Sequence, residues 1–197
     1  MVVLDEDRLE FKRQLIHLLN GSAISVAVWF FKPAIGLYVL VPLLIALMLL
    51  YFTPRLWPDL KVSNHLMHHF ERREDIKNFP FKGAIMYGLG IIPPIVLLPV
   101  NYACAVILIL SVGDAFSNLV GRRWGIHKVG HRSLEGSFGF LVTSWAVSGF
   151  LIDPLQAGLL AFVGTLIELF IPFDDNLTIP GGLSLVVLAM GFAPLAV

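Results

Sequence analysis

The chemically informative part of this sequence runs from Gly113 to Ser137, GDAFSNLVGRRWGIHKVGHRSLEGS, between two apolar runs. If Asp114 near its start lies on a helix, Ser117 and Asn118 follow at i+3 and i+4, so a carboxylate, a hydroxyl and an amide share one face. Such ligands suit Mg²⁺, which takes one or two protein carboxylates and completes its shell with water and substrate phosphates. The alternative is that Asp114 and Asn118 only join helices through hydrogen bonds.

The basic residues of this segment indicate a phosphate ligand. Arg122, Lys128 and Arg132 are separated by glycines, including Gly125, which give the backbone the freedom that a loop around phosphates needs. The alternative is that these bases only anchor the loop on the cytoplasmic side of a membrane.

Two acids further along the chain are candidate partners of Asp114. Glu168 lies in an apolar run, where an ionised carboxylate costs at least about 2–3 kcal/mol unless it is paired or faces a polar cavity. Asp175 belongs to the Asp174-Asp175-Asn176 cluster that follows. We predict that Asp114 lies within metal-bridging reach of Glu168 or Asp175 at one face of the protein. The alternatives are a buried ion pair between Glu168 and a loop arginine, and a helix cap at the cluster.

The rest of the chain is typical of an all-α membrane protein. Hydrophobic residues make up 57% of the 197 residues, and the mean hydropathy is +0.81. They form blocks of about 20 residues, long enough as helices to cross roughly 30 Å of hydrocarbon. We predict a single domain over residues 1–197, a polytopic membrane helix bundle with about seven transmembrane helices and a cytoplasmic N-terminus.

The predicted spans are Leu15–Phe31, Ala34–Phe52, Gly83–Pro99, Tyr102–Val120, Phe138–Ile152, Leu155–Phe173 and Leu183–Val197. We expect Pro93 and Pro94 to kink or break the third span, and Pro180-Gly181-Gly182 to form a turn before the last.

The basic residues predict the orientation. With these spans, all but one of the 14 Lys and Arg residues fall on one side, in the N-terminal segment and in loops 53–82 and 121–136, and Lys32 falls on the other. Basic loops stay in the cytoplasm, so we expect the site to face the cytoplasm, most simply at a prokaryotic cell membrane. A transporter usually carries its ionisable residues near the bilayer midplane, whereas Asp114 and Glu168 lie near the inner ends of their helices. The distribution therefore favours an enzyme acting at one membrane face.

The chain resembles the CTP-dependent lipid kinase family, which includes dolichol kinase, the phytol and farnesol kinases and the yeast-type diacylglycerol kinase. The matching residues are Gly113-Asp114-Ala115, Gly121, Gly125, Lys128, the Arg132–Ser137 block, Glu168, Asp175-Asn176-Leu177 and Pro180, with Lys12-Arg13, His17, and Glu74 ahead of Gly83–Gly90. Arg132 stands where that family usually has lysine, so a bidentate fork replaces a point charge.

The resemblance implies transfer of the γ-phosphate of CTP, with Mg²⁺, to the hydroxyl of a membrane lipid alcohol. A polyprenol, dolichol or other isoprenoid alcohol is the first candidate, and diacylglycerol the second. We expect the lipid to enter from the inner leaflet, with its chain in a groove beside the third span.

Roles follow as hypotheses. The expected metal ligands are Asp114, Asn118, Glu168 and Asp175, and the catalytic candidates are Asp114, Glu135, Glu168 and Asp175. The expected nucleotide contacts are Asn118, Arg122, Lys128, Arg132, Ser133 and Gly136, through charge neutralisation and hydrogen bonds to phosphate.

Two alternative functions stay open, one enzymatic and one not. A membrane cytidylyltransferase would use the same nucleotide and metal on a lipid phosphate but release pyrophosphate, and a transporter or assembly factor would not turn over nucleotide. The expected partners are the bilayer, the lipid alcohol and the nucleotide, with no nucleic acid; a homodimer is one open oligomeric state.

A second cluster, His65, His68 and His69, has the i, i+3, i+4 spacing that could hold a transition metal. We favour an amphipathic helix at the membrane interface, with Leu66, Met67 and Phe70 facing lipid.

Overall fold

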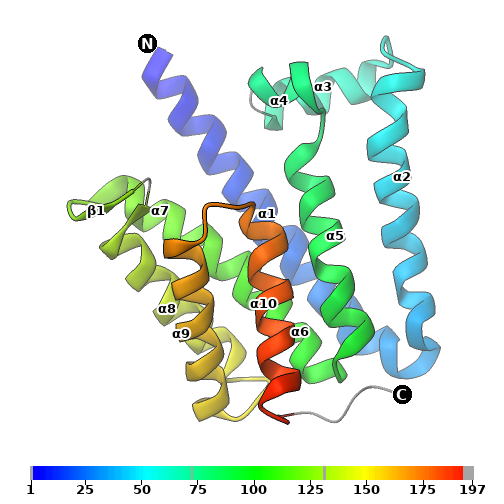
Figure 1. The fold of residues 1–197 in the computed structure, drawn as a ribbon. Helices are drawn as coiled ribbons and strands as arrows, with labels where there is room; N and C mark the ends of the chain where they lie inside the picture. Colours follow the sequence, from blue (N-terminus) through cyan, green and yellow to red (C-terminus); the bar gives the residue numbers. More distant parts are fainter. Residues whose placement is uncertain (1, 72, 131, 193–197) are drawn as a thin grey trace.

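The chain folds as a bundle of helices with one short β-hairpin (Figure 1). The computed structural model describes the backbone of residues 2–71, 73–130 and 132–192 and the side chains of residues 8–71, 75–130 and 132–192. Its elements are α1 (Val2–Ile35), the 3₁₀-helix η1 (Gly36–Val39), α2 (Leu40–Leu56), α3 (Lys61–Phe70), α4 (Arg73–Asn78), α5 (Lys82–Leu97), α6 (Val100–Leu108), the π-helix η2 (Ile109–Gly113), α7 (Asp114–Trp124), β1 (Lys128–Val129), β2 (Arg132–Ser133), α8 (Leu134–Ser148), α9 (Pro154–Phe170) and α10 (Asp175–Ala189). The predicted all-α class is confirmed.

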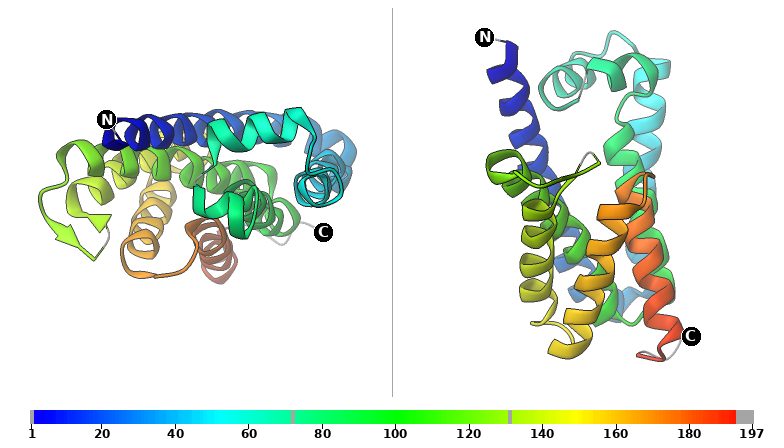
Figure 2. Two further views of the ribbon diagram at one scale, coloured as in Figure 1. Left: turned by 90° about the horizontal axis from the view of Figure 1, so that it is seen from above. Right: turned by 60° about the vertical axis from the view of Figure 1, so that its left-hand side comes forward.

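The continuous segment α6–η2–α7 forms the centre of the bundle. It packs against α1 and α8, while α9 packs against α8 and α10, and α10 against α5. Seen from above, α1 lies on one side of this central helix, and α9 and α10 lie on the other (Figure 2). Ala103, Val106, Ile107 and Leu110 in the centre are 0% exposed, so the apolar core is built around this segment.

The elements that carry the predicted chemistry gather at one end of the bundle. The N-terminus, α3, α4, the β-hairpin and the connection between α9 and α10 all lie at the upper end in Figure 1. The turn between α1 and α2 lies at the opposite end. There Gly36 has φ of 59°, a left-handed conformation that glycine adopts without steric penalty.

Two helical segments are long and apolar enough to cross a membrane by length and composition, 8–56, which includes the turn at Gly36, and 100–124. The first is mostly exposed and the second mostly buried within the bundle. The helices α5, α9 and α10 are apolar but shorter. Each predicted span overlaps a helix, although the end of the last one, residues 193–197, lies outside the described residues.

One local expectation at a proline is wrong, since Pro180-Gly181-Gly182 lies inside α10 and forms no turn. Helix α5 continues without a break through Pro93 and Pro94, and the kink expected there stays a prediction. Helix α10 instead begins five residues before Pro180, where Asp174 caps it by accepting a hydrogen bond from Asn176 N at 3.1 Å. Tertiary packing at the crossing of α5 and α10 overrides the local helix-breaking tendency.

That crossing depends on the absence of a side chain at Gly90. Pro180 has no N–H, so it cannot donate to the carbonyl of Asn176 four residues earlier. A Cβ placed on Gly90 would lie 1.7 Å from this carbonyl oxygen. Close contact between α5 and α10 therefore requires glycine here.

We predict that Gly90→Ala lowers the free energy of unfolding by about 1–3 kcal/mol or more, because the two backbones must separate. Gly181→Ala is the matched control, since a Cβ there meets nothing within 4 Å. Alanine at this helical position should stabilise by about 0.5–1 kcal/mol. Thermal unfolding in detergent, followed by tryptophan fluorescence, measures both; equal midpoints for the two variants would contradict the close contact.

Candidate functional site

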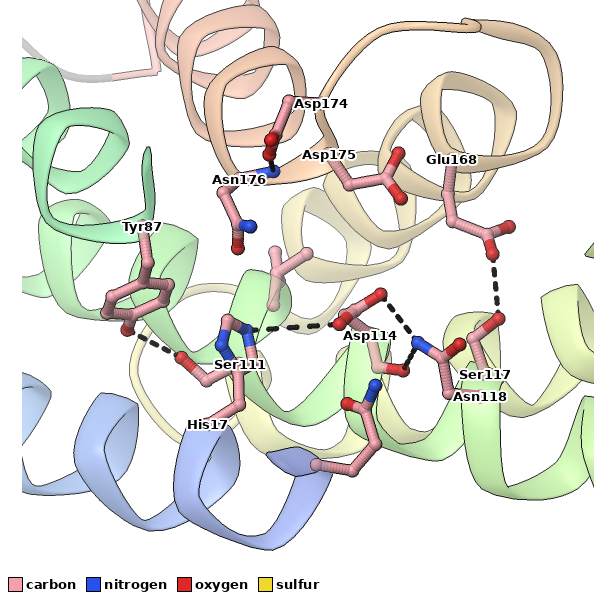
Figure 3. A network of polar contacts seen from close by, with 12 residues as sticks. His17, Tyr87, Ser111, Asp114, Ser117, Asn118, Glu168, Asp174, Asp175 and Asn176 are labelled. Atoms are coloured by element: carbon pink, nitrogen blue, oxygen red, sulfur yellow. Dashed lines mark hydrogen bonds and ion pairs between the residues drawn. The ribbon is translucent and has the colours of Figure 1, made fainter. Parts of the chain in front are cut away.

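Asp114, the first residue of α7, is the acid at the centre of the candidate site (Figure 3). Its Oδ1 accepts a hydrogen bond of 2.9 Å from Asn118 Nδ2, one turn later. Its Oδ2 lies 4.0 Å from Nε2 of His17 on α1, and the Asp114 side chain is 15% exposed. The i, i+4 spacing thus places Asp114 beside Asn118 as predicted, and it adds a histidine from another helix.

The π-helix η2 sets the direction in which Asp114 enters the site. π-Helical turns interrupt the regular hydrogen-bond ladder and occur frequently at functional sites. Side-chain hydroxyls support this turn: Ser144 on α8 donates to its first carbonyl at 3.4 Å, and Ser111 within it lies 2.8 Å from the hydroxyl of Tyr87 on α5. The backbone before Asp114 is therefore held from two sides.

A groove of about 720 Å³ opens beside Asp114, between α1, α2 and α5. Along α1 its lining changes from polar, at Gln14, His17 and Asn20, to apolar, at Ala23 and Ile24. The other walls are largely apolar, formed by Leu43, Ala46, Leu47, Leu50, Leu66, Phe70, Phe81, Ala84 and Gly88. The cavity is thus amphipathic, with the Asp114 carboxylate among its polar lining residues.

Glu168, predicted as a metal ligand, is fully enclosed by protein partners. Its side chain is 0% exposed, and Nε of Arg132 lies 3.2 Å from its Oε1. Ser117 on α7 donates to Oε1 at 2.7 Å, and Ser137 on α8 donates to Oε2 at 3.0 Å. This arrangement is the buried ion pair with a loop arginine that the sequence left as the alternative.

The two neighbouring acids Asp174 and Asp175 have different roles, a helix cap and an ion pair. Asp174 caps α10, and the carboxylate of Asp175 pairs with Nη2 of Arg132. Arg132 therefore bridges Glu168 and Asp175, and it ties the β-hairpin to α9 and α10. Because guanidinium carries five N–H donors, an ion pair at Nε that lacks hydrogen-bond geometry and a contact through Nη2 do not use all of them.

Ser133 and the glycines around it pack α7 against α8. Ser133 caps α8, its Oγ accepting from Gly136 N at 3.1 Å. A Cβ at Gly136 would lie 2.8 Å from the Ser117 carbonyl, and one at Gly121 would lie 3.0 Å from Ser133 Oγ. The close approach that the glycines allow is therefore between helices, and the predicted phosphate contact of Ser133 and Gly136 competes with this cap.

Glu135 closes the loop that follows α7. Its carboxylate accepts hydrogen bonds from the backbone N–H groups of Ile126 and His127 at 3.1 Å and contacts the His127 ring at 2.6 Å. The His127 ring contact, followed by backbone N–H groups, lowers the pKa of Glu135 from 4.5 to about 2. Since an effective general base has a pKa near the working pH, this environment favours a structural role.

The remaining predicted nucleotide contacts lie at the surface. Lys128 is exposed on β1. Arg122, whose side chain is 48% exposed, lies 3.7 Å from Glu10 on α1. Strand β1 and the end of α7, which carry these two residues, lie together at the upper left in Figure 1.

The described residues contain no group of three or more His, Cys, Asp or Glu side chains placed to hold a metal ion. This includes His65, His68 and His69 on α3, where His65 and His69 stack with ring centroids 4.1 Å apart. Asp114 fits a Mg²⁺ held by one carboxylate together with substrate phosphates. Glu168 does not fit that metal, because its oxygens already have three partners.

Sequence reasoning assigned no role to several residues of this site. Gln14, His17 and Tyr87 all line the groove, yet they lie far from Asp114 in the sequence. A polar residue inside the predicted span Leu15–Phe31 was the available signal for His17. Gln14 follows two basic residues just before that span, so no comparable signal marked it in the sequence. The side chain of Glu74, which the resemblance included, lies outside the described residues.

In comparisons with known proteins, no family model, no curated protein and no solved structure matches this chain.

We predict that Glu168→Gln lowers the free energy of unfolding by about 3 kcal/mol, because it leaves Arg132 and two serines around a neutral amide. Asp59→Asn, the same carboxylate-to-amide change at an exposed position, should leave it within about 0.5 kcal/mol. Denaturant unfolding in detergent measures both. Wild-type stability of Glu168→Gln would show that the carboxylate is not a structural brace.

We predict that the hydrogen bonds from the loop at Ile126 and His127 to the Glu135 carboxylate depend on pH. Because folding lowers the pKa of Glu135 to about 2, its contribution is present above the unfolded value of 4.5 and is lost as the pH falls toward 2. Hydrogen exchange at Ile126 and His127, compared between wild type and Glu135→Gln at each pH, should differ above pH 4.5 and converge near pH 2. Identical exchange in wild type and Glu135→Gln at neutral pH would show that the Glu135 carboxylate does not hold the loop.

Proposed function

We propose that this protein is a membrane-embedded kinase that transfers the γ-phosphate of CTP to the hydroxyl of a lipid alcohol, an isoprenoid alcohol above all. One observation carries the proposal: the Asp114 carboxylate lies among the polar lining residues of a groove whose other walls are largely apolar. Such a cavity accommodates a long apolar chain and brings its polar end to a carboxylate.

A bilayer environment is supported by the outer surface of the bundle. Large apolar side chains are exposed along α1, α2, α8 and α9, and extended exposed apolar surfaces mark membrane or partner interfaces. These side chains include Phe30, Phe31, Ile45, Met48, Leu49, Phe138, Trp145 and Phe162. Helix α3, the β-hairpin and the end of α7, which carry several of the basic residues, lie toward the upper end of the bundle in Figure 1. Lys32, near the other end of α1, donates to the Leu98 carbonyl at 2.5 Å. We therefore propose seven spans, with the site facing the cytoplasm.

The chain's own residues supply positioning and charge. Asp114, oriented by Asn118, would hold Mg²⁺ together with the nucleotide phosphates, and this ion would neutralise charge on the phosphoryl group. Arg132 and Lys128 would hold the triphosphate, Arg132 through N–H donors that its two ion pairs do not use. The resemblance of the Arg132–Ser137 block is what selects CTP as donor.

We predict that Asp114→Asn abolishes transfer, by at least about a hundredfold, because the amide cannot replace the charge facing the metal. Purified protein is assayed with Mg²⁺, CTP labelled at the γ- or the α-phosphate, ATP for comparison, and a panel of lipid alcohols. Label from the γ-position should reach the lipid with release of CDP. Asp59→Asn should retain full activity.

Two results would contradict the proposal. Undiminished turnover by folded Asp114→Asn would remove the role of this carboxylate. Transfer of the α-label with release of pyrophosphate would show a cytidylyltransferase.

A further inference from the structure

The polar part of the groove contains a fixed hydrogen-bond acceptor without a partner. Gln14 is 7% exposed, and its Oε1 meets no donor within the described chain. Its Nε2 donates to Oε1 of Glu10 at 3.3 Å. Because a carboxylate only accepts hydrogen bonds, the amide cannot be reversed without turning its oxygen toward Glu10. Gln14 therefore brings to the lining of the groove an acceptor that no described residue satisfies.

His17 also has a ring nitrogen without a hydrogen-bond partner in the part of the chain that the structure describes. It lies three residues after Gln14 on α1, and therefore on the same helix face. Its Nε2 has no hydrogen-bond partner within the described residues, since the Asp114 Oδ2 lies 4.0 Å away. The ring is held edge-on against Tyr87, with centroids 4.6 Å apart. When Nδ1 carries the proton, Nε2 is an acceptor. Unpaired polar atoms inside a protein are uncommon and are usually completed by water or a ligand.

The charges around this part of the groove do not suit an anionic headgroup. Arg13 is the one Lys or Arg among the described residues that line it. Its guanidinium already pairs with Glu10 at 3.0 Å. Asp114 and Glu71 add carboxylates to the lining. An entering lipid phosphate would meet acceptors and negative charge, whereas an alcohol would supply the missing donor.

We propose that Gln14 and His17 bind the hydroxyl of the acceptor lipid, so that the groove selects a neutral alcohol over the corresponding lipid phosphate. The O–H donates to one of the two acceptors, which holds the oxygen on the Asp114 side. The chain then lies along Ala23, Ile24 and Ala27, the apolar part of α1 in the groove. The inference rests on the proposed function for the fate of the hydroxyl, but binding itself needs no turnover.

The test is lipid binding without nucleotide. Purified protein in detergent is titrated with geranylgeraniol and with geranylgeranyl monophosphate, and bound lipid is counted by native mass spectrometry. The monophosphate should bind at least about tenfold more weakly than the alcohol. Gln14→Met and His17→Phe, which keep side-chain bulk but remove an acceptor, should each weaken alcohol binding about three- to tenfold, the effect of one hydrogen bond.

The matched control is Gln156→Met, at the chain's other glutamine, which lies on α9 and accepts from Tyr102 at 2.5 Å. It should bind the alcohol as wild type does. Wild-type affinity of both Gln14→Met and His17→Phe, or equal affinity for the monophosphate, would overturn the inference. Selective alcohol binding with no transfer from CTP would leave this subsite standing and remove the proposed kinase. If Gln14→Met transfers phosphate from CTP with an unchanged KM for the alcohol, the proposed kinase stands and this subsite is removed.

Discussion

The buried carboxylate of Glu168 is the constraint on which the site depends. A charge in an apolar interior is stable only with well-placed partners, and Glu168 takes them from three elements: Ser117 on α7, Ser137 on α8 and Arg132 on β2. Ser117 lies one turn from Asp114. The brace therefore fixes the helix that presents Asp114, and Arg132 extends it through Asp175 to α10.

This brace separates structural acids from the acid that is available for chemistry. Glu168 and Asp175 share one ion-pair partner, Arg132, while Asp174 caps a helix and Glu135 closes a loop. Asp114 alone among the proposed catalytic acids lines the groove. We therefore propose that phosphoryl transfer takes place where the apolar part of the groove meets its polar lining at Asp114.

Local patterns in the sequence predicted the helices and the pairing of Asp114 with Asn118, because helical periodicity and i, i+4 spacing are local properties. They failed where long-range packing decides. Pro180 lies inside a helix because Gly90 of α5 contacts the backbone of Asn176. Gly121 and Gly136 allow two helices to approach closely. Composition alone could not separate this role from that of a phosphate-binding loop, which is also rich in glycine. His17 and Gln14 join Asp114 only through the packing of α1 on α7, and no spacing rule links positions so far apart.

The most direct test of the central claim, that the groove between α1, α2 and α5 holds the lipid, is photo-crosslinking with a geranylgeraniol analogue that carries a diazirine at its tail. The account predicts labelling of groove residues such as Ile24, Leu47 and Ala84, suppressed by excess unlabelled geranylgeraniol. Labelling confined to outward-facing residues such as Phe138 and Phe162, unaffected by the competitor, would contradict it.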